Sequence, residues 1–166
     1  MGGLFLRIKF IKEIVRRLKY VYDTKCPIEI IKLKNINLTF LPNDTECHDL
    51  QGMYFKCSSD KFIFINPNLS DELRRVTYAH ELGHAILHDS VNAFSLNSTY
   101  FCDRLEREAD IFACEMLLDD DIFDEYYGFS DEYIAKCEGV TVEMVRLKFK
   151  NMDKSKIKYD ECCFLY

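Results

Sequence analysis

The sequence of 166 residues contains no tryptophan and only three prolines, and it has no long uninterrupted apolar segment. Hydrophobic residues make up 48% of the chain and charged residues 30%, which excludes a protein that is mainly disordered, collagen-like or proline-rich. No apolar run approaches the roughly 18 residues that a transmembrane helix needs. We therefore predict a soluble globular protein, large enough to bury a core of its own.

An excess of basic residues is also missing, because the net charge is -6 and the isoelectric point is about 5.3. Nucleic-acid binding through bulk charge needs a surplus of lysine and arginine to neutralise phosphates. The composition argues against that class of protein and leaves only a local basic patch as a route to nucleic acid.

The eight cysteines include no C-x-x-C pair, which excludes a zinc ribbon. Charge interrupts the first apolar stretch at Arg7, too early for a secretory signal peptide. We therefore expect a cytoplasmic protein whose thiols are reduced and form no disulfides.

The first 22 residues are expected to form a basic amphipathic helix. Apolar side chains recur at three- and four-residue steps from Leu4 to Val21, with lysine and arginine between them. Such a stripe could lie on a membrane, bind a partner or pack on the core of its own protein, and the last is its ordinary role.

A small sheet is predicted within residues 28–66, followed by helices. The β-rich runs are Ile28–Leu33, Ile36–Leu41, Met53–Cys57 and Phe62–Ile65, with a hairpin at Ser58–Lys61. Ser70, followed by two acidic residues, is a good N-cap for a helix that runs to about His88. A second helix is expected from about Asp103 to Leu118, and the chain is then acidic and helical over 119–166.

The segment His80-Glu81-Leu82-Gly83-His84 is an H-E-x-x-H motif. On a helix its two histidines lie about 40° apart and one turn along, so both imidazoles can reach one metal ion, with Glu81 beside it as a base. A shuffled chain of this composition would contain roughly 0.008 such motifs. Gly83 costs a helix about 1 kcal/mol relative to alanine, which indicates a close approach of another element there.

A catalytic zinc needs a third protein ligand and an open position for water. On the second helix the apolar residues from Ala109 to Leu117 define a buried stripe, and the helical phase directs Glu106 and Asp110 inward with them. Inward carboxylates are costly without partners. Glu106 is therefore the candidate ligand, and Asp110 is the candidate acceptor for the other ring N–H of a ligand histidine. The alternative is that both are carboxylates at the rim of the stripe.

The same phase predicts that Glu108, Glu115 and Arg104 occupy the polar face of the second helix. His88 lies two turns beyond His80, too far to share a metal with it as a helical neighbour. We expect His88 to contact a metal ligand without binding the metal itself, or to interact with the carboxyl end of its helix. His48 has no partner pattern and is expected in a loop.

Two segments carry a family pattern. Residues 74–88 read RRVTYAHELGHAILH and residues 106–118 read EREADIFACEMLL. Together they resemble the ImmA/IrrE family of zinc metallo-endopeptidases, and a weaker resemblance extends upstream through Gly52 and residues 63–66. Where that family's second helix commonly ends in Leu-Leu-Met-Pro, this chain has Leu-Leu-Asp-Asp at 117–120, a departure that affects the following loop and not the metal site.

The resemblance implies Zn²⁺ held by His80, His84 and Glu106, with Glu81 as the catalytic residue. It also implies the substrates: cytosolic repressors of mobile elements or stress regulons, cut at a specific site. With the pattern of elements, it predicts one α+β, zincin-like domain over 1–166, in which a small sheet lies beside two zinc-binding helices. In that site Glu81 would take a proton from water and pass it to the leaving amine of an extended substrate strand.

Residues 130–150 have the residue pattern of a helix-turn-helix, so a DNA-binding or protein-interaction regulator is the alternative function. A DNA-binding module would use Arg146, Lys148 and Lys150, but acidic residues surround the candidate recognition helix. For a peptidase, the basic helix from Arg7 to Lys19 and the acidic segment from Asp119 to Glu132 could orient a protein substrate, or both could be solvated faces.

Overall fold

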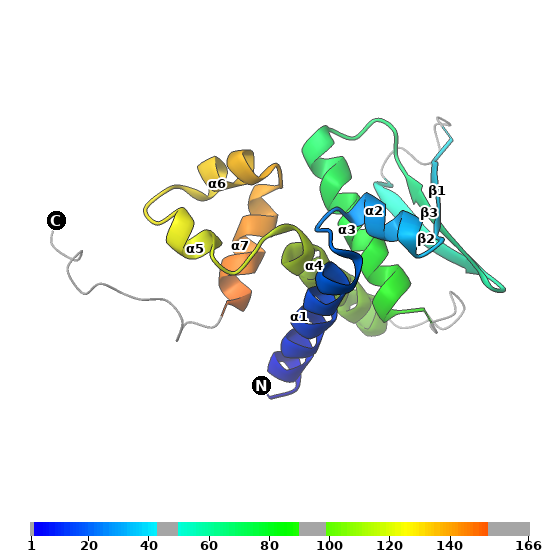
Figure 1. The fold of residues 1–166 in the computed structure, drawn as a ribbon, viewed down its shortest axis with the longest axis horizontal. Coiled ribbons are helices and arrows are strands. Elements are labelled where there is room, and N and C mark those ends of the chain that lie inside the picture. The colour runs from blue at the N-terminus through cyan, green and yellow to red at the C-terminus, as the bar shows by residue number, and fades with distance from the viewer. Residues whose placement is uncertain (1, 43–49, 90–98, 153–166) are drawn as a thin grey trace, which may run out of the picture.

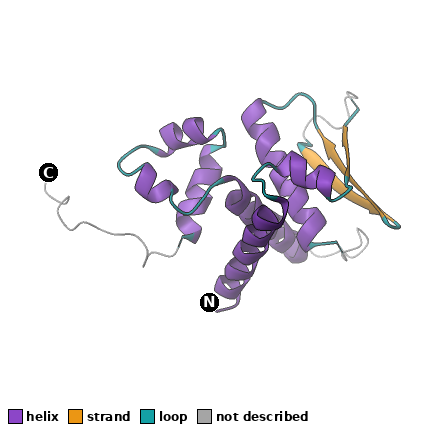
Figure 2. Ribbon diagram, in the orientation of Figure 1, coloured by secondary structure: helices purple, strands orange, loops and turns teal. Residues whose placement is uncertain are grey.

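Seven helices and one three-stranded sheet make up the part of the chain that the computed structural model describes, which is residues 2–42, 50–89 and 99–152 (Figure 1, Figure 2). This is the predicted α+β class. The helices are α1 (Gly2–Tyr22), α2 (Pro27–Leu33), α3 (Asp71–Leu87), α4 (Thr99–Leu117), α5 (Ile122–Glu125), α6 (Asp131–Glu138) and α7 (Val142–Asn151). The strands are β1 (Asn37–Phe40), β2 (Gly52–Cys57) and β3 (Asp60–Ile65).

The sheet has the order β1-β3-β2, with β3 parallel to β1 and antiparallel to β2. The predicted hairpin joins β2 to β3, and Ser58 takes a positive φ of 56° in its turn. Ile63 and Ile65 are fully buried on the face of β3 that meets the core. Strand β2 lies at the edge of the sheet and, like β3, packs against α3.

The strand predicted at Ile28–Leu33 is wrong, because these residues form α2. Pro27 occupies the first turn of this helix, where its missing N–H costs nothing, and Glu29 is favourable beside the helix N-terminus. The run of isoleucines is typical of strands, but Ile30 and Ile31 are both buried on a single helical face. The sheet therefore begins at Asn37 and not at residue 28.

Helix α3 is the central element, with the sheet and α2 packed against it on one side and α4 on the other (Figure 1). Its N-cap is Ser70, whose hydroxyl accepts a hydrogen bond of 3.2 Å from the backbone N–H of Leu73. The helix ends at Leu87, with His88 as its C-cap. Both ends agree with the sequence-based boundaries.

The face of α4 predicted to be polar is in fact covered in part, by α1 and α7, whereas Arg104 is exposed as predicted. Glu108 and Glu115 expose 4% and 7% of their surface. The guanidinium of Arg7 donates to Glu108 at 2.5 Å, and the ammonium of Lys148 donates to Glu115 at 2.7 Å. The helical phase correctly groups these glutamates on one face, but it carries no information about which helices pack there.

The apolar stripe of α1 packs on the core of its own protein, where Ile11, Val15 and Leu18 are buried. The described helices include none that is long and apolar enough to cross a membrane.

The basic helix and the acidic segment, for which substrate docking and solvated faces are the two alternatives, partly neutralise each other. Lys12 lies 3.1 Å from Asp120, and Lys19 lies 2.9 Å from Asp119. These charges serve internal packing of α1 against the segment after α4.

Within the C-terminal tail, which begins at residue 119, α6 and α7 are the two helices of the predicted helix-turn-helix. Lys148, which the alternative DNA-binding function would use, is 1% exposed and lies 2.7 Å from both Glu115 and Asp120. Arg146 pairs with Asp131 at 3.0 Å. Lys148 is therefore excluded as a DNA contact, because its charge is used to hold α7 on α4.

Replacing Lys148 by methionine should lower the free energy of unfolding by about 3 kcal/mol, measured by urea denaturation. Removing one partner of a buried ion pair leaves the other charge buried, here Glu115, whose remaining ion pair among the described residues is with Lys12 at 3.4 Å. R146M, on the same helix but in an exposed pair, should cost less than about 1 kcal/mol. Equal losses in K148M and R146M would contradict this account of α7.

Candidate metal centre

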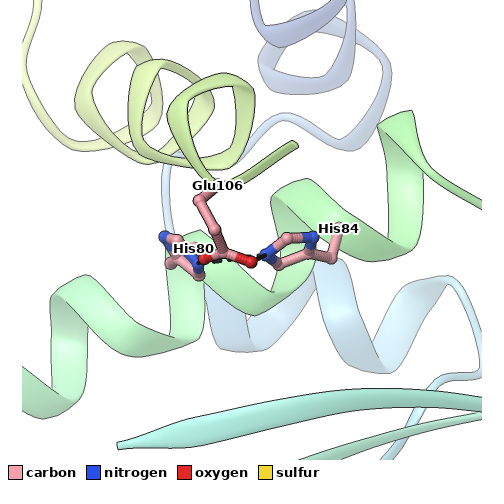
Figure 3. Close-up of side chains that lie close together, drawn as sticks. All are labelled: His80, His84 and Glu106. Carbon is pink, nitrogen blue, oxygen red and sulfur yellow. Dashed lines mark hydrogen bonds and ion pairs between the residues drawn. The ribbon is translucent and has the colours of Figure 1, made fainter. Parts of the chain in front are cut away.

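His80, His84 and Glu106 converge where α3 faces α4 (Figure 3). The two histidines are one turn apart on α3, and Glu106 reaches them from the neighbouring helix. Nε2 of His80 lies 3.0 Å from Nε2 of His84. The oxygens of Glu106 lie 3.2 Å from Nε2 of His80 and 3.5 Å from Nε2 of His84.

This spacing suits a small metal ion. Ligand atoms held by a tetrahedral Zn²⁺ at 2.0–2.1 Å are themselves about 3.3 Å apart. Glu106 makes its two contacts through different oxygens, and one ligand atom from each of the three residues lies within 4.8 Å of the other two. Imidazole nitrogens with a carboxylate oxygen are ligands that divalent transition metals bind well. The three side chains could therefore hold one metal ion without a large rearrangement.

The far nitrogen of each histidine has its own partner. Nδ1 of His80 lies 2.9 Å from Oδ1 of Asp110, and Nδ1 of His84 lies 3.1 Å from Nδ1 of His88. His88 is buried, and its Nε2 lies 3.2 Å from Glu108. These contacts orient both rings so that each Nε2 points toward Glu106.

The electrostatics of the cluster favour a positive charge among the three side chains. Burial opposes protonation of His80, but hydrogen bonds to Asp110 and Glu106 outweigh it and raise its pKa to about 10. Polar contacts with the rings of His80 and His84 hold the pKa of Glu106 below its ordinary value. A proton or a metal ion can supply that charge.

Glu106 and Asp110 lie at the rim of the α4 stripe, with 60% and 51% of their side chains exposed. The expectation that they point into the buried stripe is therefore wrong, and the rim alternative describes their exposure. Both still reach His80, because α4 crosses α3 closely at this point. The exposed side of Glu106 leaves the cluster open to solvent.

Glu81 is separate from the cluster and lies under β2. It is 6% exposed, its carboxylate accepts a hydrogen bond from the backbone N–H of Tyr54, and burial raises its pKa. A Cβ atom on Gly52, the first residue of β2, would lie 3.0 Å from Oε1 of Glu81. Strand β2 thus holds the carboxylate at one place beside His80.

The structure explains why a glycine occupies position 83 of the helix. A Cβ there would lie 3.2 Å from the Cα of Ala109 and 3.2 Å from the side chain of Phe112, so the close approach is that of α4 itself.

Sequence reasoning missed the contact of Tyr54 with Glu81 and the burial of Glu108, since neither leaves a pattern in one segment. His48 lies outside the described residues.

Comparison with known proteins places the chain among peptidases. A family model described as the IrrE N-terminal-like domain, a peptidase family, matches residues 32–150. Uncharacterized immunity region protein 2 of Bacillus phage phi105 is 38% identical over 142 residues, which cover 83% of this chain and 88% of the phage protein. Metallopeptidase ImmA of Bacillus subtilis strain 168 is 33% identical over 133 residues, covering 76% of each chain.

Replacing Gly52 by alanine should lower the free energy of unfolding by about 2 kcal/mol, because the new methyl group overpacks the contact of β2 with α3. A Cβ at this position would lie only 2.6 Å from Cγ2 of Thr77. T77S removes that methyl group and keeps the hydroxyl that donates to the Leu73 carbonyl at 2.8 Å. The cost of G52A, measured by urea denaturation, should therefore shrink in a T77S background, and an unchanged cost would refute the proposed steric conflict.

Proposed function

The chain belongs to the ImmA/IrrE family of metallopeptidases, and we propose that it is a zinc-dependent endopeptidase that makes a specific cut in a cytosolic protein. The observation that carries this proposal is the convergence of His80, His84 and Glu106 beside the buried Glu81. The arrangement offers three ligands for a metal and a separate carboxylate for proton transfer, which is the division of roles that peptide hydrolysis needs.

We assign His80, His84 and Glu106 as the metal ligands and Zn²⁺ as the metal. Two imidazoles and one carboxylate form a ligand set that catalytic zinc uses, with a fourth position left for water. When bound, Zn²⁺ supplies a Lewis acid for the scissile carbonyl and lowers the pKa of water at the site. Asp110 accepts the Nδ1–H of His80, so Nε2 is the ring nitrogen that would bind the metal.

Glu81 is the proposed catalytic residue. Its carboxylate is not part of the His80–His84–Glu106 cluster, and the N–H of Tyr54 fixes its orientation. In this role Glu81 removes a proton from the attacking water and delivers it to the nitrogen of the leaving amine, so that the same carboxylate serves as base and then as acid.

The proposed substrate is a transcriptional repressor of a mobile element or stress regulon. Support comes from the names of the two relatives, one an immunity region protein of a phage and the other a metallopeptidase. The alternative of direct DNA binding through the tail has little support, because Lys148 is buried and Arg146 is paired with Asp131.

Replacing Glu106 by glutamine should remove most of the zinc from the purified protein, measured by elemental analysis. The change keeps the size of the side chain but removes the charge of one of three ligands. D103N, on the exposed surface of the same helix, is the matched control and should keep about one zinc per chain. Equal zinc contents in E106Q and D103N would refute the assignment of Glu106.

The E81Q variant should fold and bind zinc like the unmodified chain but should not cut the substrate, because only the proton acceptor is lost. The measurement is co-expression with the repressor encoded nearest to this chain's gene, followed by detection of one discrete fragment. Chelation should abolish the cut and added zinc should restore it.

Cleavage that persists in E81Q would refute the proposed mechanism. An intact repressor together with free degradation of unfolded proteins such as casein would refute the regulatory role and indicate a general quality-control peptidase.

A further inference from the structure

A chain of buried polar contacts runs from the metal centre to the N-terminal helix. Nδ1 of His84 lies 3.1 Å from Nδ1 of His88, and Nε2 of His88 lies 3.2 Å from Oε2 of Glu108. The same oxygen accepts a hydrogen bond of 2.5 Å from Arg7 of α1. Oε1 of Glu108 accepts one of 3.0 Å from Arg104. The contacts therefore join three helices behind His84.

The chemistry of these groups sets the direction of every hydrogen bond in the chain. A carboxylate beside two guanidinium groups accepts and does not donate, so Nε2 of His88 carries a proton and donates to Glu108. With its proton on Nε2, His88 can accept at Nδ1, and Nδ1 of His84 is then the donor in this contact. The unprotonated nitrogen of His84 is therefore Nε2, the atom that faces His80 and Glu106.

Burial strengthens the hydrogen bonds between these side chains. The side chains of His88 and Glu108 are each 5% exposed, so water cannot replace a lost partner. Arg104 is 57% exposed and lies on α4 with Glu108, whereas Arg7 is 32% exposed and comes from a helix 101 residues away in the sequence. Arg7 lies closer to Glu108 than Arg104 does, at 2.5 Å against 3.0 Å, and it is the residue that connects α1 to the site.

We propose that α1 is part of the metal centre and that Arg7 is a positioning residue, acting through Glu108 and His88 to orient His84. The inference rests on the proposed role of His84 as a metal ligand. Helix α1 lies before residue 32, where the match to the peptidase family begins, so the family match itself assigns it no part in the site. Displacement of α1 would then weaken metal binding without touching a ligand.

The test is a zinc titration of the full-length chain against a competing chelator. R7Q and E108Q should each lower zinc affinity by about tenfold or more, the usual effect of losing a hydrogen-bonding partner behind a metal ligand. R7K, which keeps a cation near Glu108, should recover part of the loss. R17Q is the matched control, because Arg17 is an exposed arginine on the same helix.

A double-mutant comparison separates positioning from a general loss of stability. If Arg7 acts through His88, R7Q should weaken zinc binding no further in a chain that already carries H88A. Zinc affinity equal in R7Q and R17Q, or losses from R7Q and H88A that simply add, would overturn the inference. Failure of the unmodified chain to bind zinc would overturn the ligand assignment first, and this inference with it.

Discussion

The close contact of α3 with α4 is the constraint on which the site depends. The three side chains that could hold a metal come from two helices, so the distance between the helices sets the distances between their ligand atoms. Gly83 makes that distance short, because its missing side chain leaves room for Ala109 and Phe112. The same approach brings Asp110 to 2.9 Å from His80. The glycine at position 83 therefore serves both purposes: it lets α4 pack closely on α3, and it brings the metal-binding side chains of the two helices together.

Helix α4 carries carboxylates on more than one face, and each face meets a different kind of partner. Glu106 and Asp110 meet His80 and His84 of α3, whereas Glu108 and Glu115 meet cations from α1 and α7, and Glu108 also contacts His88 at the end of α3. Buried ion pairs of this kind add little net stability compared with apolar packing, but an unpartnered member is strongly unfavourable. We infer that these ion pairs determine where α1 and α7 pack on α4. The hydrogen bonds that orient the metal-binding histidines depend on that packing.

Sequence reasoning succeeded where the deciding signal lies within one element. The H-E-x-x-H spacing, the Ser70 cap and the helical phase that groups Glu106 with Asp110 are all local. It failed where the outcome depends on distant packing. The β-branched residues of Ile28–Leu33 favour a strand, whereas the segment packs as a helix that begins at Pro27. The burial of Glu108 depends on Arg7, which no pattern within α4 indicates. The ion pair of Lys148 with Glu115 joins residues far apart in the sequence and is not indicated by either segment alone, for the same reason.

X-ray absorption spectroscopy of the zinc-loaded chain tests the central claim most directly, because it identifies the atoms bound to the metal independently of any activity. The account predicts two imidazole nitrogens, with oxygen as the other ligand type, all at about 2.0–2.2 Å. The chain has eight cysteines that could compete for zinc. A zinc–sulfur distance of about 2.3 Å, or a single imidazole, would contradict the site formed by His80, His84 and Glu106.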